Sequence, residues 1–513
     1  MSERLAGILL HPTSLPGPYG IGELGDEATA FLDFLAGAGC RLWQVLPLGP
    51  TGYGDSPYQC FSAFAGNPLL VSLDRLRQEG LLSAADLAGR PGWPEREVDF
   101  GAVIEFKRPL LAKAFAAFER SAAPERRGHF DAFRAAQAAW LPDFALFMAL
   151  KHARGGAAWH TWDPPLVHRE AKALESARRA LAGKVREIEF EQWLFFEQWA
   201  GLRAQAAERQ IRIMGDIPIF VAHDSADVWA HPEIFHLAAD GRPSFQAGVP
   251  PDYFSATGQL WGNPLYRWDA LARTGYAWWI DRFRAVLALV DLVRLDHFRG
   301  FEAYWQVPGD APTAERGKWV KGPGAAFFEA LLGALGALPI VAEDLGVITP
   351  EVEALRDRFG FPGMAILQFA FGGDAHANDF LPHNYPKHKV VYTGTHDNDT
   401  VVGWWTAGVG DTTRTQAEVE REHQRALAYV GGDGSEINWD FIRTLFVSVA
   451  ETAIVPLQDV LGEGSASRMN LPGRPSGNWK WRFAVSQLTP EVRRRLHAIT
   501  DGAGRTAPPD GQP

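Results

Sequence analysis

Short apolar runs bounded by Gly or Pro recur along the chain, and no other feature restricts the fold as strongly. Runs of this length without alternation are typical of strands buried on both faces of a parallel sheet. Helical patterns separate most of them. We count eight candidate strands: Ala6–Leu10, Leu42–Leu46, Ile211–Ile219, Val290–Leu295, Pro339–Ala342, Met364–Ala370, Lys389–Thr393 and Ala453–Val460. Eight strands alternating with helices favour an α/β fold, a (β/α)8 TIM barrel, over an open doubly wound sheet.

The spacing of these runs predicts how the barrel is interrupted. More than 150 residues separate the second and third runs, and the apolar residues of this intervening segment repeat with a helical period. We therefore expect 1–64 to start the barrel, 65–187 to be a mainly helical insertion, and 188–500 to complete the barrel. Within the last part, the Gly/Pro-rich and aromatic tract 240–264 predicts an active-site loop. The polar tail 501–513 is expected to be disordered.

Charge and cysteine content exclude several classes of protein. The 50 Lys and Arg residues are outnumbered by 61 Asp and Glu residues, giving a net charge of −11, which argues against a nucleic-acid partner. The two cysteines, Cys40 and Cys60, cannot form a disulfide framework or a multi-cysteine zinc site. No window reaches the ~18 uninterrupted apolar residues of a membrane span. These observations predict a soluble, cytoplasmic protein without a membrane partner, and they leave its oligomeric state open.

Acidic residues follow four of the predicted strands directly. They are Asp216 after the third, Asp296 at the end of the fourth, Glu343 after the fifth and Asp397 after the seventh. In a barrel, the carboxyl ends of the strands meet on the face where active sites lie. The four acids are therefore expected to line one rim.

Several carboxyl groups around one cavity suit the cleavage of a glycosidic bond. One carboxylate attacks the anomeric carbon, a carboxylic acid protonates the departing oxygen, and a third acid can hold sugar hydroxyls. Arg294 lies two residues before Asp296, on the same face of the strand, where it can keep that carboxylate ionised and oriented. Most of the 61 aromatic residues (19 Trp, 10 Tyr and 32 Phe) are expected to fill the core, but such flat rings also stack on the apolar faces of sugars.

Other interpretations of the same residues remain open at this point. Any single acid at a strand end can be a helix cap or an ion-pair partner, and Asp344 and Asp399 fit that description best. His396, Asp397 and Asp399 could hold a cation, although no H-E-x-x-H pair exists. The sequence also lacks a G-x-S-x-G elbow and nucleotide-binding glycine loops. We expect neither a metal nor a cofactor.

At these residues the sequence resembles the amylomaltases, the 4-α-glucanotransferases of the α-amylase superfamily. The matching stretches run in one order from about residue 7 to 482: GILLHPTSLPGPYGIGELG, WQVLPLGPTGYGDSPYQ, GDIPIFVAHDSADVWA, GVPPDYFSATGQLWGNPLY, VRLDHFRGFEAYW, VAEDLG, LPHNYP, VYTGTHDNDT, RMNLPG and GNWKWR. The resemblance implies a cofactor-free glycosyltransferase that moves α-1,4-glucan segments between maltooligosaccharides. An α-glucan hydrolase or branching enzyme on the same barrel is the nearest alternative, and a non-catalytic glucan-binding protein is a more distant one.

The resemblance also implies roles for individual residues. Asp296 is expected to be the nucleophile, Glu343 the general acid and base, and Asp397 the third acid. Substrate contacts are expected from six more residues: Tyr58, Asp216, Asp252, Trp261, Arg294 and His396. Asn470 in RMNLPG is a weaker candidate, with structural support of its loop as a second interpretation. Retention through a double displacement predicts carboxyl groups of Asp296 and Glu343 about 5–5.5 Å apart.

Overall fold

The computed structural model describes residues 4–251, 257–373, 377–408 and 415–506, and the account below is confined to them. Within these residues, eight strands form one parallel sheet in the order β10-β11-β12-β1-β2-β3-β6-β9. Their bounds are β1 Leu5–Leu9, β2 Leu42–Gln44, β3 Arg212–Pro218, β6 Leu292–Asp296, β9 Ile340–Ala342, β10 Gly363–Ile366, β11 Lys389–Tyr392 and β12 Thr452–Pro456. Each lies within or beside one of the predicted runs, so the eight-strand prediction is confirmed.

The sheet curls until its edge strands meet, which makes it a nearly closed barrel. The amide of Ala342 at the end of β9 donates to the carbonyl of Pro362 just before β10, at 2.9 Å. Asp344 spans the same seam: its Oδ1 accepts from the amide of Met364 at 2.7 Å, and its other oxygen pairs with Arg356. Asp344 is thus a structural acid, as one interpretation of the sequence held.

Two predicted strands end earlier than their apolar runs. The run Met364–Ala370 leaves the sheet after Ile366 and continues as a 3-10 helix, Leu367–Phe371. The run Ala453–Val460 ends as a strand at Pro456, where the short helix α18 (Leu457–Val460) begins. Both continuations are buried, so hydrophobicity alone could not mark where the strand stops.

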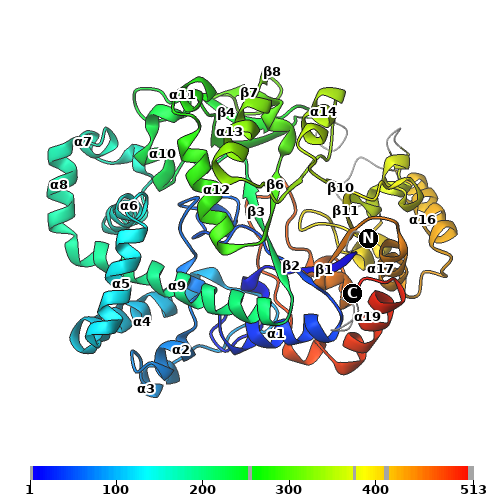
Figure 1. The fold of residues 1–513 in the computed structure, drawn as a ribbon, viewed down its shortest axis with the longest axis horizontal. Coiled ribbons are helices and arrows are strands. Elements are labelled where there is room, and N and C mark those ends of the chain that lie inside the picture. Colours follow the sequence, from blue (N-terminus) through cyan, green and yellow to red (C-terminus); the bar gives the residue numbers. More distant parts are fainter. Residues whose placement is uncertain (1–3, 252–256, 374–376, 409–414, 507–513) are drawn as a thin grey trace.

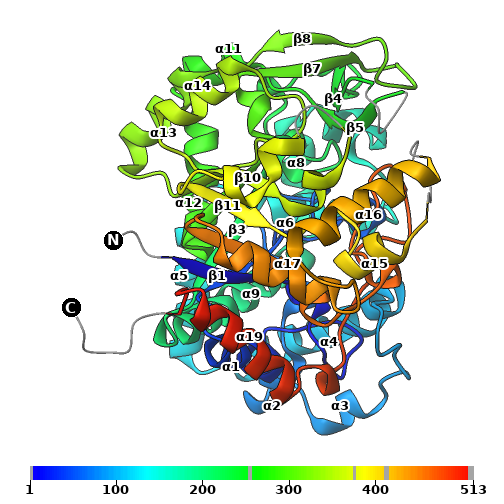
Figure 2. The same cartoon turned by 90° about the vertical axis from the view of Figure 1, so that its right-hand side faces the viewer.

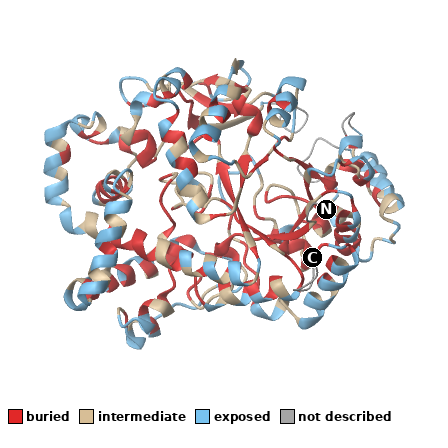
Figure 3. Ribbon diagram, in the orientation of Figure 1, coloured by how far each residue is buried: buried red, intermediate tan, exposed pale blue. Residues whose placement is uncertain are grey.

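Helices cover the barrel, with their inner faces buried and their outer faces exposed (Figures 1 and 3). Those that follow or precede barrel strands are α1 Asp26–Gly37, α10 Ala226–Ala230, α11 Trp268–Arg273, α12 Ala277–Leu289, α13 Ala325–Leu335, α14 Pro350–Arg358, α15 Val401–Thr406, α16 Gln416–Val430, α17 Ile437–Val447 and α19 Pro490–Gly502. No helix in the described residues is long and apolar enough to cross a membrane.

The segment between β2 and β3 is helical and extends to the left of the barrel in Figure 1. It consists of α2 Leu73–Gln78, α3 Ala84–Ala88, α4 Phe100–Ser121, α5 Pro124–Ala136, α6 Leu141–Ala153, α7 Pro164–Val167, α8 Ala171–Ala180 and α9 Ala182–Glu208. Phe118 and Phe130 of α4 and α5 pack on Trp193 of α9, with ring centroids 5.4 and 5.5 Å away. The boundary expected at 187 falls inside α9, which continues to Glu208, shortly before β3 begins at Arg212.

A second, four-stranded sheet stands above the barrel, at the top of Figure 2, and the sequence did not predict it. Its antiparallel strands are β4 Phe245–Val249, β5 Gln259–Pro264, β7 Ala303–Pro308 and β8 Lys318–Lys321, in the order β5-β4-β7-β8. The tract 240–264, expected to be an unpatterned loop, therefore contributes a hairpin. Its Gly and Pro residues concealed the strands, because such residues are rare in strand interiors.

The chain end is more ordered than expected. Residues 501–506 were predicted to belong to a disordered tail, but α19 continues to Gly502 and Arg505 is fully buried. The Arg505 guanidinium donates to the carbonyls of Leu5 and Ala450, at 3.0 and 2.8 Å, and so ties the chain end to the base of the barrel. The rest of the predicted tail, 507–513, lies outside the described residues.

Candidate active site

A buried arginine links two carboxylates at the ends of neighbouring strands. Arg294 Nη1 lies 2.6 Å from Asp216 Oδ2, and its Nη2 lies 2.7 Å from Asp296 Oδ1. Asp216 of β3 is in register with Arg294 of β6, while Asp296 stands two residues further along the same face. Charge-assisted contacts of this kind are short and directional, and they fix the orientation of Asp296. Asp296 keeps 27% of its side chain exposed, so it remains accessible to a substrate.

Asp216 is the most enclosed of these acids. Its Oδ2 also accepts a hydrogen bond from the Tyr58 hydroxyl at 2.8 Å. Its Oδ1 is buried and has no hydrogen-bond partner among the described residues. Burial raises the pKa of Asp216, and the guanidinium of Arg294 acts in the opposite direction. A buried carboxylate with an unpaired oxygen is suited to accept a hydrogen bond from a hydroxyl group of a ligand.

Glu343 follows β9, the strand next to β6. Leu295 pairs with Ala342 in the sheet, so the next residues along the two strands, Asp296 and Glu343, face each other. Two backbone amides hold the carboxyl group: His297 donates to Oε2 at 2.8 Å and Leu345 to Oε1 at 3.0 Å. Burial, followed by the negative charge of Asp296, raises the pKa of Glu343 to about 7, although Arg294 and the two amides lower it. Glu343 can therefore be a proton donor near neutral pH.

The residue that directly follows Asp296 and contacts Glu343 has an unusual backbone conformation. His297 lies in the left-handed region, with φ 54° and ψ 50°, a conformation that costs energy for a residue with a Cβ. This turn points its amide at Glu343. The half-buried imidazole meets the ring of Trp261 edge to face, with centroids 5.0 Å apart. Burial lowers the pKa of His297 to about 4, so the ring is neutral near pH 7.

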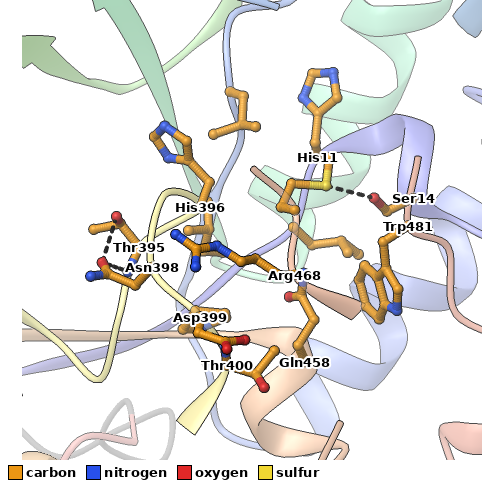
Figure 4. A pocket seen from close by; sticks show the side chains of 15 residues that line it. His11, Ser14, Thr395, His396, Asn398, Asp399, Thr400, Gln458, Arg468 and Trp481 are labelled. Atoms are coloured by element: carbon orange, nitrogen blue, oxygen red, sulfur yellow. Dashed lines mark hydrogen bonds between the residues drawn. The ribbon is translucent and has the colours of Figure 1, made fainter. Parts of the chain in front are cut away.

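Asp397 is held by a loop from the far end of the chain. Asn470 Nδ2 donates to Asp397 Oδ1 at 2.6 Å, and the amide of Asn470 donates to the carbonyl of His396 at 3.0 Å. Arg468 donates to the carbonyls of Asp397 and Asn470 and fastens the two segments together. Figure 4 shows Arg468 beside His396. Asn470 supports its loop, as the second interpretation of the sequence held, and the same contacts orient the carboxyl group of Asp397.

An aromatic platform lies beside Asp397. The rings of Tyr58 and His396 are stacked, with centroids 5.0 Å apart and planes inclined by 17°. Trp479 packs against both, at 5.8 and 5.9 Å. His396 Nε2 also lies 3.5 Å from Asp397 Oδ1. The platform thus joins Tyr58, which bonds to Asp216, to the third acid.

A small pocket lies behind the Asp397 loop (Figure 4), lined by His11, His396, Asp399, Gln458 and Arg468 among others. Asp399 does not serve the site directly: it accepts from the hydroxyl of Ser465 at 2.6 Å and from the amide of Thr400 at 2.8 Å. Like Asp344, it is a structural acid. No group of three His, Cys, Asp or Glu side chains in the described part of the chain could hold a metal ion.

One continuous set of contacts brings most of the predicted site residues together. It runs from His396 and Asp397 through Tyr58, Asp216, Arg294 and Asp296, and the turn at His297 adds Glu343 and Trp261. Asp252 lies outside the described residues. The sequence reasoning considered His297 only as a rim candidate for a cation, and it missed Arg468 and the Leu345 amide. Arg468 stands inside the quoted motif RMNLPG, which was a usable signal, whereas a backbone amide leaves none.

Comparisons with known proteins find relatives that match nearly the whole chain. The family model described as 4-alpha-glucanotransferase matches residues 10–488. A 4-alpha-glucanotransferase of Thermus thermophilus is 56% identical over 508 residues, covering 98% of this chain and 99% of the relative. One from a Synechocystis species is 53% identical over 509 residues, covering 98% and 99%. Among solved structures, an amylomaltase from Streptococcus agalactiae in complex with acarbose has a TM-score of 0.93 at 40% identity, covering 98% of this chain and all of that one.

Proposed function

This chain belongs to the 4-alpha-glucanotransferase family, and from that premise we propose that it transfers α-1,4-glucan segments between maltooligosaccharides by a retaining double displacement. The observation that carries the mechanism is the contrast between its two neighbouring acids. Arg294 pairs with the carboxyl group of Asp296 at 2.7 Å, while burial and the charge of Asp296 raise the pKa of Glu343 to about 7. An ionised acid beside a protonated one is the arrangement that glycosyl transfer through a covalent intermediate requires.

In the first displacement, an Asp296 oxygen attacks the anomeric carbon of the donor sugar. The bond from that carbon to the glycosidic oxygen breaks, and Glu343 gives its proton to the departing oxygen. The products are a glucosyl ester on Asp296, a shortened glucan with a free 4-hydroxyl group, and Glu343 as a carboxylate. The His297 and Leu345 amides stabilise that carboxylate, because both donate to its oxygens.

In the second displacement, the 4-hydroxyl of an acceptor glucan attacks the same carbon. Glu343 takes the proton of that hydroxyl, the ester bond to Asp296 breaks, and the α configuration is restored. Water entering instead would give hydrolysis. Trp261 offers a ring beside His297, and we assign it to the acceptor side, where stacking favours sugar over water.

Asp397 and the aromatic platform are assigned to the donor sugar. Asp397 keeps 45% of its side chain exposed while Asn470 fixes one of its oxygens, so the carboxylate is oriented and still open to sugar hydroxyls. Tyr58 and His396 present stacked rings to the apolar face of a pyranose. The second oxygen of Asp216 supplies a further acceptor. Both cysteines are free thiols, which suits a reducing compartment, and we propose a cytoplasmic enzyme.

Incubation with maltotriose tests the reaction. A transferase gives glucose and a ladder of longer α-1,4 chains, whereas a hydrolase gives only shorter products and a branching enzyme introduces α-1,6 bonds. We expect the ladder. Chains that only shorten would support the hydrolase instead, and intact maltotriose would support a glucan-binding protein.

Trapping tests the mechanism. A 5-fluoro-α-glucosyl fluoride reacts readily in the first step and slowly in the second, so the covalent intermediate accumulates. Peptide mass analysis should then find the sugar on Asp296, and the Asp296→Ala variant should remain unlabelled and without turnover. A sugar on any other residue would remove Asp296 from its role.

A further inference from the structure

The segment that follows β6 is fastened to the segment that follows β9 at three consecutive residues. The His297 amide donates to the Glu343 carboxyl group, and the Phe298 amide donates to the Glu343 carbonyl at 3.1 Å. The third contact is made by a side chain: the Arg299 guanidinium donates to the carbonyl of Val347. These contacts fix the carboxyl group and the carbonyl of Glu343, and they also fix the chain at Val347, four residues further along.

The stretch between Glu343 and Val347 contains the other amide on the carboxyl group. Leu345 donates to Glu343 Oε1 at 3.0 Å, and the turn then passes through Gly346 at φ +87°. Val347 itself is 64% exposed, so its side chain adds little packing. The contact from Arg299 to the Val347 carbonyl therefore fixes the end of the turn on which the Leu345 amide depends.

Arg299 is itself held in place by the second sheet. Its guanidinium lies 3.8 Å from the ring centroid of Trp319 on β8, close enough for a cation–π contact. The end of β8 is tied to the short helix that carries Arg299: Lys321 pairs with Glu302, and the Gly322 amide donates to the Glu302 carbonyl at 2.7 Å. Arg299 is buried, whereas Trp319 is 39% exposed.

We propose that Arg299, clamped by Trp319, is a positioning residue for Glu343, acting through the Val347 carbonyl and the Leu345 amide. Strand β8 of the four-stranded sheet, which stands above the barrel in Figure 2, thereby contributes to acid catalysis without touching the sugar. This inference rests on the role proposed for Glu343 as general acid and base.

The direction of the effect follows from the groups that face Glu343. From β6 these are Asp296, which raises its pKa, and Arg294, which lowers it. Three further groups lie nearby. Asp216 on β3 contacts Arg294, and Asp344 is paired with Arg356. The ring of His297 is neutral near pH 7. Around Arg299 lies Glu302, paired with Lys321. The Leu345 amide favours the carboxylate, so loosening that amide raises the pKa of Glu343 and delays loss of the acid as pH rises.

The experiment compares Trp319→Leu and Arg299→Gln with the parent enzyme. Trp319→Leu keeps the charge of Arg299 and removes the ring that holds it. For each protein, kcat/KM is measured against pH with maltotriose, whose leaving group needs a proton, and with α-maltosyl fluoride, whose leaving group needs little help. Lys318→Met, an exposed change on the same strand that leaves Arg299, Trp319 and the Lys321–Glu302 pair in place, is the matched control.

We expect both variants to lose about tenfold in kcat/KM on maltotriose and far less on the fluoride. Their alkaline limb with maltotriose should move up by about one pH unit, and Lys318→Met should match the parent. Equal losses on both substrates, or an unshifted limb in Trp319→Leu, would overturn the inference while leaving Glu343 in its role. An active Glu343→Gln variant would overturn the proposed function itself, and the two failures are thereby distinguished.

Discussion

Two buried ion pairs in this protein use the same chemistry for different ends. Glu23 pairs with Lys107 where the first barrel loop meets the helical insertion, with side chains 3% and 0% exposed. Asp216 pairs with Arg294 at the barrel rim, with side chains 0% and 5% exposed. Burial is equal, so it cannot be what separates a structural pair from a functional one. The two pairs differ in how many of their polar atoms have hydrogen-bond partners.

In the first pair, every charged group has partners. Lys107 Nζ donates to Glu23 and to the carbonyls of Leu69 and Val71, at 2.6 and 2.8 Å, while the second Glu23 oxygen accepts from the amide of Leu73. In the second pair, Asp216 Oδ1 and Arg294 Nε have no partner among the described residues. Arg294 also holds Asp296, which is partly exposed. A saturated pair stabilises the fold, whereas one with unused polar atoms is ready for a ligand.

The largest effect is expected where the open network meets the substrate. Asp296→Asn keeps the shape of the side chain and removes the nucleophile, so kcat on maltotriose should fall by about 10⁴-fold. Binding of maltotriose, measured by calorimetry, should persist, and the free energy of unfolding should change by less than about 1 kcal/mol. A kcat within tenfold of the parent would contradict the open-network interpretation.

The saturated pair should respond in the opposite way. Lys107→Met leaves the Glu23 carboxylate buried without its cation, and the free energy of unfolding in urea should fall by about 3–5 kcal/mol. The kcat per folded molecule should not change. In the double variant Glu23→Leu, Lys107→Met, most of the stability should return, because no buried charge remains.

The loss in Lys107→Met should depend on pH. Burial raises the pKa of Glu23 to about 7 in the folded protein, above its ordinary value, and removing Lys107 takes away a group that lowers it. The folded state then binds a proton more tightly than the unfolded state, so stability is retained at low pH and lost as pH rises through the folded pKa. Unfolding at about pH 5 should show a smaller deficit than at about pH 8, and a deficit independent of pH would contradict this account.

A smaller effect is expected on the pKa of Glu343 when the charge of Asp296 is removed. The charge of Asp296 raises the pKa of Glu343, which burial brings to about 7, so Asp296→Asn should lower the Glu343 pKa by about one to two units. Carbon-13 labelling of the Glu carboxyl groups would follow the titration by NMR, and Glu343→Gln identifies the signal. An unchanged midpoint would mean that burial alone sets the pKa of Glu343.

The barrel and its acidic rim could be predicted because each depends on local signals. The apolar runs marked all eight strands, and the acids directly after them had to meet at one rim. Asp344 and Asp399 could not be separated from Glu343 and Asp397 in this way. They follow the same strands, and only their partners, Met364 and Ser465, distinguish them.

The second sheet and the supports of the site needed the structure. Strands β4 and β5 lie in a tract rich in Gly and Pro. β4 pairs with β7, about 60 residues further along the chain, and β7 pairs in turn with β8. The amides of His297 and Leu345 reach Glu343 because the backbone turns there, and any residue type can supply an amide. Sequence patterns identify side-chain chemistry, while contacts made by the backbone depend on the fold.

The smallest expected effect tests whether Tyr58 belongs to the open network or only to the stacking platform. Tyr58→Phe retains the ring that stacks on His396 and removes the hydroxyl that donates to Asp216 Oδ2. If the hydroxyl matters, one oxygen of a buried carboxylate loses its donor, Arg294 is drawn more strongly to Asp216, and Asp296 is held less well. The expected loss in kcat on maltotriose is about three- to tenfold, near 1 kcal/mol, with KM nearly unchanged. Tyr58→Leu, which removes the ring as well, should raise KM in addition. Kinetics of Tyr58→Phe equal to those of the parent would mean that the stacked ring, rather than the bond to Asp216, is what Tyr58 provides.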